Sequence, residues 1–102
     1  MFVLIALLYG CNKNETLFQS IGSSYSGIHF RNDIIENDSV NQLDLENVYN
    51  GGGVGIGDFN NDGLPDIFFT GNILPSRLYL NKSQFRFTDI TQESGINTSG
   101  KW

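Results

Sequence analysis

Several residue types are scarce in this chain of 102 residues, and each scarcity excludes a class of structure or partner. The chain has one cysteine, so no disulfide bond forms within it. Six lysines and arginines stand against eleven aspartates and glutamates, which gives a net charge of −5. Because nucleic acid is bound by basic patches, this balance argues against a nucleic-acid partner. The single histidine, His29, lies beside Phe30 and is interpreted as a packed residue rather than a metal ligand or a base.

Glycine, in contrast, is abundant, and seven residues contain five of the twelve glycines. Residues 51–57 have the sequence GGGVGIG, which disfavours a helix. Val54 and Ile56 alternate with glycines, which predicts a strand with one apolar face and one bare face that a neighbouring sheet can approach closely. A phosphate-binding P-loop is excluded because an acid follows this stretch, where that motif has Lys-Ser/Thr.

The next nine residues, 58–66, have the sequence DFNNDGLPD and are rich in oxygen ligands. Ca²⁺ takes about six to eight oxygen ligands at roughly 2.3–2.6 Å, from carboxylates, amides and backbone carbonyls. Gly63 stands where the loop must turn sharply. The spacing therefore predicts a Ca²⁺ site whose ligands are the side chains of four residues and the carbonyl of a fifth. These candidate metal ligands are Asp58, Asn60, Asp62, Asp66 and, through its carbonyl, Leu64.

The residues on either side of this loop, and the ligand types within it, distinguish the other interpretations. An EF-hand or a dockerin-like module has a helix on each side and an acid at position twelve, which here is Phe69. Mg²⁺ suits this large, flexible ligand set less well than Ca²⁺, and Zn²⁺ lacks a histidine or cysteine in the loop. The remaining alternative is an ordinary Asn/Asp/Gly turn that binds no metal.

The residues around the loop predict an all-β fold. Strands are expected around Val54 and Ile56 and at residues 67–70, 77–81 and 85–90, with turns at 72–76 and 81–83. Leu78 and Leu80 are expected on one face of the third strand, and Phe85 and Phe87 are expected to point inward from the fourth. Four short strands with turn signals between them indicate one antiparallel sheet.

Taken together, residues 51–96 resemble the FG-GAP/VCBS repeat of integrin-α-like β-propellers. The resemblance is carried by GGGVGIGDFNNDGLPDIFFTGN and SRLYLNKSQFRFTDITQESGI. It is closest to the repeat of bacterial surface proteins that often also have an ASPIC/UnbV domain. The resemblance implies a four-stranded antiparallel propeller blade, with Ca²⁺ bound in the loop between its first two strands by the five ligands named above. Such proteins carry several repeats, whereas this chain has one complete repeat.

The first eleven residues are predicted to be a lipoprotein-type signal segment. They are apolar, too few to span a bilayer, and end in Leu-Tyr-Gly-Cys, which resembles a bacterial lipobox. The resemblance implies that Cys11 is acylated and anchors the protein to a membrane. No lysine or arginine precedes Cys11, and a buried structural cysteine is the alternative.

The remaining segments are predicted to be irregular. Residues 12–50 are expected to form a tether followed by weak strands at 17–18 and 28–30, then an acidic, Asn-rich loop at 32–50 with a short helical turn near 43–48. A solvated loop is favoured there over a second metal site, because the acids lack ligand-like spacing. Residues 97–102 are expected to begin a further blade, so the chain is interpreted as an N-terminal fragment.

These features favour a non-catalytic, calcium-binding surface lipoprotein of the bacterial cell envelope. Its expected partners are the neighbouring blades of the same protein, a membrane through its lipid anchor, and an extracellular glycan or protein ligand. The alternative is a fragment of a propeller enzyme, such as a polysaccharide lyase, glycosidase or oxidoreductase, whose catalytic residues lie in other blades.

Overall fold

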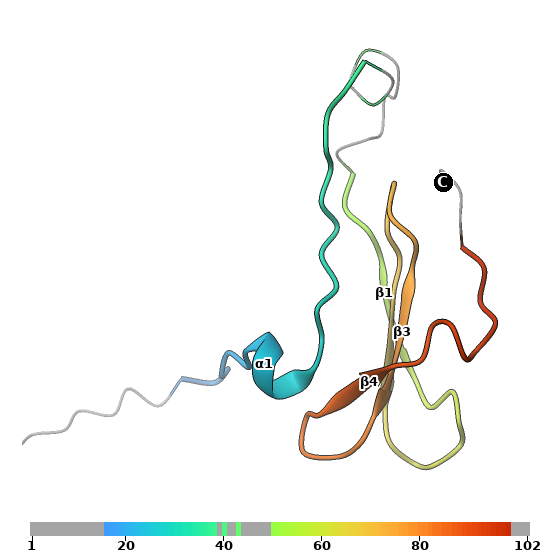
Figure 1. The fold of residues 1–102 in the computed structure, drawn as a ribbon. Coiled ribbons are helices and arrows are strands. Elements are labelled where there is room, and N and C mark those ends of the chain that lie inside the picture. Colours follow the sequence, from blue (N-terminus) through green and yellow to red (C-terminus); the bar gives the residue numbers. More distant parts are fainter. Residues whose placement is uncertain (1–15, 39, 41–42, 44–49, 99–102) are drawn as a thin grey trace, which may run out of the picture.

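The computed structural model describes residues 16–38, 40, 43 and 50–98 (Figure 1). Within these residues the chain forms a single sheet of four antiparallel strands, each paired with the next in sequence. The strands are β1 (Val54–Gly57), β2 (Asp66–Phe69), β3 (Arg77–Asn81) and β4 (Phe87–Asp89). The one described helix, α1 (Ser23–Ser26), is a single short turn. The all-β prediction is therefore confirmed for this part of the chain.

The pairing register gives the sheet two different faces. Ile56 lies opposite Ile67, and Ile67 lies opposite Tyr79. Because directly opposed residues point to the same side, these side chains share one face, here called the tyrosine face. The opposite face, here called the leucine face, carries Leu78 and Leu80, as predicted. The glycines of β1 also lie on the leucine face and leave it bare at that edge of the sheet.

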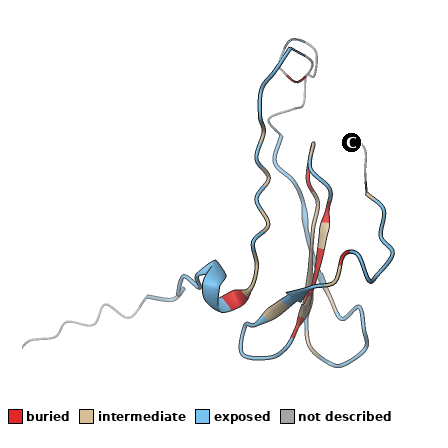
Figure 2. Cartoon of the chain, in the orientation of Figure 1, coloured by how far each residue is buried: buried red, intermediate tan, exposed pale blue. Residues whose placement is uncertain are grey.

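An extended N-terminal segment covers part of the tyrosine face. The Phe30 ring stacks on the Phe69 ring, with centroids 5.0 Å apart and planes inclined by 13°. Phe69 in turn meets the edge of Tyr79 at 5.8 Å. Tyr79 is 2% exposed and Leu78 is 5% exposed, so the burial concentrates on β3, with solvent reaching both edge strands (Figure 2). The core is thus thin and centred on the middle of the sheet.

Gly27 lets this N-terminal segment approach β4. It ends α1 in the left-handed conformation, with φ at +76°, and its N–H donates to the Ser23 carbonyl. A Cβ atom added at Gly27 would lie 2.5 Å from the carbonyl oxygen of Phe87. Both the turn and the close approach therefore require glycine at this position.

We expect Gly27→Ala to lower the free energy of unfolding by about 1–3 kcal/mol, because alanine adds left-handed strain and a backbone clash. The measurement is chemical denaturation of the whole chain followed by circular dichroism. Gly22→Ala is the matched control, since Gly22 has φ at −69° and an added Cβ there would meet only Ser24 Oγ, at 3.9 Å. Equal stabilities of the two variants would contradict this account of Gly27.

The predicted start of the fourth strand is wrong. Strand β4 begins at Phe87, while Ser83, Gln84 and Phe85 have positive φ values of 70°, 50° and 58°. The turn is closed by the Lys82 N–H, which donates to the Arg86 carbonyl at 2.7 Å. This wide turn extends through Phe85, so the Phe85 side chain is 64% exposed instead of pointing inward.

The weak strand signals near the N-terminus are also wrong. Leu17 and Phe18 are 97% and 88% exposed and belong to no strand. Residues 28–30 run beside the sheet and contact it through the Phe30 ring instead of a backbone ladder (Figure 1). His29, expected to be packed, is exposed. The acidic region is irregular where it is described, with a tight turn in which Asn37 and Val40 pair. Residues 17–18 and 28–30 are therefore not strands, because their backbones form no ladder with a neighbouring strand.

Other predictions fall outside the described residues. These are the signal segment at residues 1–11 with Cys11, most of the helical turn near 43–48, and the last four residues of the expected next blade. Asn97 and Thr98 are described and form no strand. No helix in the described part of the chain is long and apolar enough to cross a membrane.

Candidate metal site

The oxygen-rich loop, residues 58–65, joins β1 to β2 at one end of the sheet. Gly57 and Asp66 are opposed in the ladder, so the loop begins and ends where the two strands separate. Gly63 adopts φ at +83°, in the left-handed region, and an added Cβ there would meet nothing within 4 Å. Glycine is therefore needed at this point for the turn of the backbone and not for space.

Asp58 organises the centre of the loop by accepting two backbone hydrogen bonds. Its Oδ1 accepts the N–H of Asp62 at 3.0 Å, and its Oδ2 accepts the N–H of Gly63 at 2.8 Å. The Asp62 N–H is shared with Asn60 Oδ1 at 3.2 Å. These bonds fold the loop back on itself around the Asp62 N–H, which the Asp58 and Asn60 side chains share.

Asp62 is held by its neighbours while remaining at the surface. Its Oδ1 accepts the Leu64 N–H at 2.9 Å, and its Oδ2 accepts Asn60 Nδ2 at 2.8 Å. The bond from Asn60, helped by the Leu64 N–H and the charge of Lys82, lowers the pKa of the Asp62 carboxyl below its ordinary value. Because the pKa is lower in the folded chain, the ionised Asp62 carboxylate stabilises the fold. This stabilisation is complete above the unfolded pKa, about 3.9, and is lost as the pH falls through the folded pKa. The carboxylate is therefore ionised at neutral pH and carries the charge that a cation needs.

Asp66 differs from the other candidate ligands because it is completely buried, with 0% of its surface exposed. Its Oδ2 accepts the N–H of Phe59 in the loop at 2.9 Å. Its Oδ1 accepts the N–H of Asn81 at the end of β3, at 2.8 Å. One carboxylate thus ties the loop to a strand fifteen residues away, a role that is independent of any metal.

Asn81 completes this connection and was not singled out by the sequence as a functional residue. Its Nδ2 donates to the Pro65 carbonyl at 3.0 Å, and its Oδ1 accepts the Ser83 N–H at 2.8 Å. The side chain therefore joins the end of the loop to the turn between β3 and β4. The sequence signal was slight: a polar residue closing an apolar alternating strand.

The donor set suits a hard cation. Every candidate side-chain ligand offers oxygen, and a carboxylate oxygen that accepts one N–H keeps a second lone pair for an ion. Asp58, Asn60 and Asp62 lie on one exposed loop that the hydrogen bonds above already shape. Asp66 lies at the base of the loop, and the Leu64 residue between them is half-buried.

The acidic side chains themselves do not converge in this conformation. Among the described residues, no group of three or more His, Cys, Asp or Glu side chains is placed to hold a metal ion. The carboxylates accept hydrogen bonds from backbone amides instead, and their like charges oppose closer approach. Two of the five candidate ligands, the Asn60 side chain and the Leu64 carbonyl, are neutral oxygen ligands and not acids.

No family model, curated protein or solved structure matches this chain. The fold and loop define a class by structure alone. It is a four-stranded antiparallel sheet with an acidic loop at one end, whose carboxylates accept hydrogen bonds from backbone N–H groups.

Proposed function

We propose that this chain is a calcium-stabilised blade of an FG-GAP/VCBS-type β-propeller, which serves as a non-catalytic binding or adhesion module of a bacterial surface lipoprotein. The observation that supports the proposal most strongly is the loop between β1 and β2. Its spacing of oxygen ligands is that of a Ca²⁺ loop, and backbone N–H groups hold the Asp58 and Asp62 carboxylates in place. An ordinary two-strand turn has no need for so many acids.

The sheet supports the blade assignment. Its strands follow one another in space in the same order as in the sequence, as expected of a blade made of a simple meander. Val54 and Ile56 on the edge strand β1 are 62% and 72% exposed. Repeat units generally bury such surfaces against their neighbours, so a following or preceding blade is the proposed partner of this edge.

The proposed role of Ca²⁺ is structural. Three carboxylates within nine residues repel one another, and a divalent ion between them removes most of that repulsion. Because Asp66 also binds the end of β3, an ion that fixes the loop would fix the relative positions of β1, β2 and β3. A blade held in this way presents its outer loops rigidly to a glycan or protein ligand, while acylated Cys11 would hold the protein at the cell envelope.

Isothermal titration calorimetry of the whole folded chain with CaCl₂ tests the proposal. We expect one site with a Kd on the order of 10⁻⁴–10⁻³ M, the range of extracellular Ca²⁺ modules, and weaker binding of Mg²⁺. Asp62→Asn keeps the shape of the side chain but removes its charge, and should weaken Ca²⁺ binding by at least about tenfold. Glu93→Gln, an exposed position outside the loop, is the charge-matched control and should bind as the wild type does. Absence of binding at millimolar Ca²⁺ by a folded wild-type chain would refute the calcium role.

A further inference from the structure

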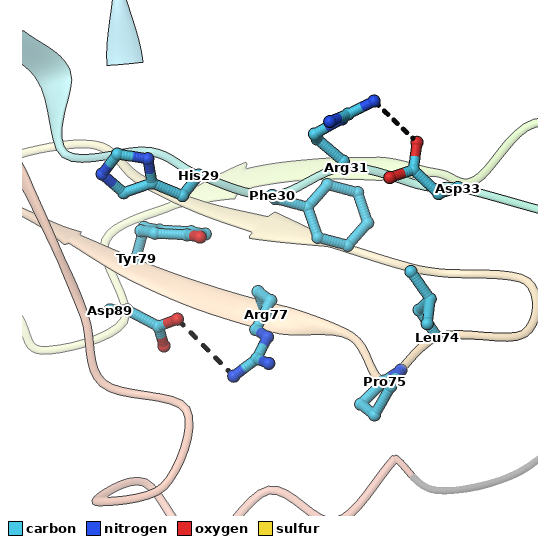
Figure 3. Close-up of a pocket in the computed structure, with 9 residues that line it drawn as sticks. All are labelled: His29, Phe30, Arg31, Asp33, Leu74, Pro75, Arg77, Tyr79 and Asp89. Atoms are coloured by element: carbon cyan, nitrogen blue, oxygen red, sulfur yellow. Dashed lines mark ion pairs between the residues drawn. The ribbon is translucent and has the colours of Figure 1, made fainter. Parts of the chain in front are cut away.

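A groove of about 380 Å³ lies on the tyrosine face, and none of its lining residues belongs to the oxygen-rich loop (Figure 3). One wall comes from the extended N-terminal segment, through His29, Phe30, Arg31 and Asp33. The other wall comes from residues 74–75, from Arg77 and Tyr79 on β3, and from Asp89 on β4. It is here called the Tyr79 groove. Its volume lies in the range of small-ligand sites.

The hydroxyl of Tyr79 opens into this groove. The tyrosine as a whole is 2% exposed, so its ring is fixed in the core. Every buried side-chain nitrogen and oxygen among the described residues has a hydrogen-bond partner. The Tyr79 hydroxyl has no hydrogen-bond partner among the described residues, so it is not one of those buried atoms and contacts solvent in the groove. Figure 3 shows it turned toward the space between Phe30 and Arg77. A rigidly held hydroxyl that both donates and accepts is the kind of group that orients a small ligand.

Two ion pairs border the groove and balance its charge. Arg77 Nη1 lies 3.7 Å from Asp89 Oδ2, a diagonal pair across β3 and β4 that follows from the opposition of Tyr79 and Asp89. On the other wall Arg31 Nη2 lies 3.3 Å from Asp33 Oδ1. The side chains are partly exposed, so each arginine keeps free N–H groups and Asp33 keeps free lone pairs. Asp89 Oδ1 already accepts the N–H and the hydroxyl of Thr91, at 3.0 and 2.6 Å, so Oδ2 is the Asp89 oxygen left to accept from a ligand. With two positive and two negative groups, the groove has no surplus charge to attract an anion.

The groove also has apolar walls, supplied by Phe30, Leu74 and Pro75. Paired donors and acceptors around an apolar surface match a ligand with several hydroxyls on a ring of C–H groups. Each hydroxyl can accept from an arginine and donate to a carboxylate, whereas a carboxylate or phosphate ligand would face Asp33 and Asp89.

We infer that the Tyr79 groove is a binding site for a neutral, hydroxyl-rich sugar of about monosaccharide size. Tyr79 orients the sugar through its hydroxyl, and Arg77 with Asp89 binds neighbouring hydroxyls of the ring. This inference rests on the proposed binding role, for which it names the ligand class, but the groove shares no residue with the metal loop.

Saturation-transfer difference NMR of the whole chain with glucose, galactose or mannose tests the inference. We expect transfer to at least one of these hexoses, with a Kd on the order of 1 mM for so small a ligand. Tyr79→Phe removes only the hydroxyl, and Arg77→Met removes donors while keeping an apolar stem. Each should weaken binding about threefold to tenfold. Arg86→Met is the matched control, because Arg86 lies over the Tyr25 ring at 4.6 Å, outside the groove, and binding should stay within about twofold of wild type.

Three results would overturn the groove as a sugar site. They are the absence of transfer to all three hexoses, undiminished binding by both groove variants, and stronger transfer to glucuronate than to the neutral hexoses. Each titration is run with CaCl₂ and with EDTA, beside the calorimetric Ca²⁺ measurement. If the wild-type chain binds Ca²⁺ but none of the sugars, the groove proposal is refuted and the calcium role stands. If it binds a sugar but no Ca²⁺, the groove proposal is supported and the calcium role is refuted.

Discussion

Calcium is expected to raise the free energy of unfolding of the wild-type chain by about 2.7 kcal/mol when free Ca²⁺ reaches 100 times its Kd. The reason is mass action: in the proposed role, Ca²⁺ binds the folded loop and not the unfolded chain. The gain should grow with the logarithm of the Ca²⁺ concentration. Urea denaturation at a series of buffered Ca²⁺ concentrations, followed by circular dichroism, measures it.

Variants of the loop separate this effect from general salt stabilisation. Asp58→Asn and Asp62→Asn each remove one charge and retain an amide oxygen, so most of the Ca²⁺-dependent gain should disappear. In EDTA, Asp62→Asn should be close to wild type in stability, because Asp62 is exposed and its hydrogen bonds are local. Glu93→Gln should retain the full gain. If Asp62→Asn gained as much from Ca²⁺ as wild type, the loop would be a turn and not a metal site.

The second large effect is expected at Asp66, where Asp66→Ala should lower the free energy of unfolding by about 2–5 kcal/mol even in EDTA. The substitution leaves the N–H groups of Phe59 and Asn81 without their acceptor, and an unsatisfied buried donor costs about 1–3 kcal/mol. It also leaves a space where the carboxylate was completely buried. Urea denaturation in EDTA measures the loss.

Asp66→Asn tests the same contact more gently. Its remaining oxygen can still accept one of the two N–H groups, so about half of the loss is expected. Asp33→Asn is the control, since Asp33 makes a surface ion pair and should change stability by at most about 1 kcal/mol. A loss at Asp66 that appeared only with Ca²⁺ present would mean that Asp66 acts through the metal and that its two amide bonds contribute little.

The strands show how far local patterns reach. Strand β3 was predicted with the observed bounds, a strand was correctly expected around Val54 and Ile56, and β2 was predicted one residue too late, because alternation and glycine punctuation are local signals. Strand β4 was predicted too long, since the turn expected at 81–83 continues through Phe85, the last of three consecutive residues with positive φ. Non-glycine residues rarely adopt that conformation, so Gln84 and Phe85 gave no local sign that the turn continues.

Burial was harder to predict than pairing. Alternation placed Leu78 and Leu80 on one face, which the register bears out, but Tyr79 on the other face is the most buried hydrophobic residue described. The cause is the packing of Phe30 against Phe69, a contact between residues 39 positions apart whose geometry no local pattern encodes. The Tyr79 groove exists for the same reason, because its walls come from the N-terminal segment and from β3.

The sequence by itself determined the antiparallel strand pattern, the excess of acid and the spacing of the five candidate ligands, since each depends on neighbouring residues. Tertiary structure alone decided that Asp66 is buried and binds Asn81, that Gly27 must be glycine, and that Arg77, Tyr79 and Asp89 face the N-terminal segment. These depend on distances between residues far apart in the chain. Such distances are set by how the sheet and its covering segment pack, and packing is a property of the whole fold.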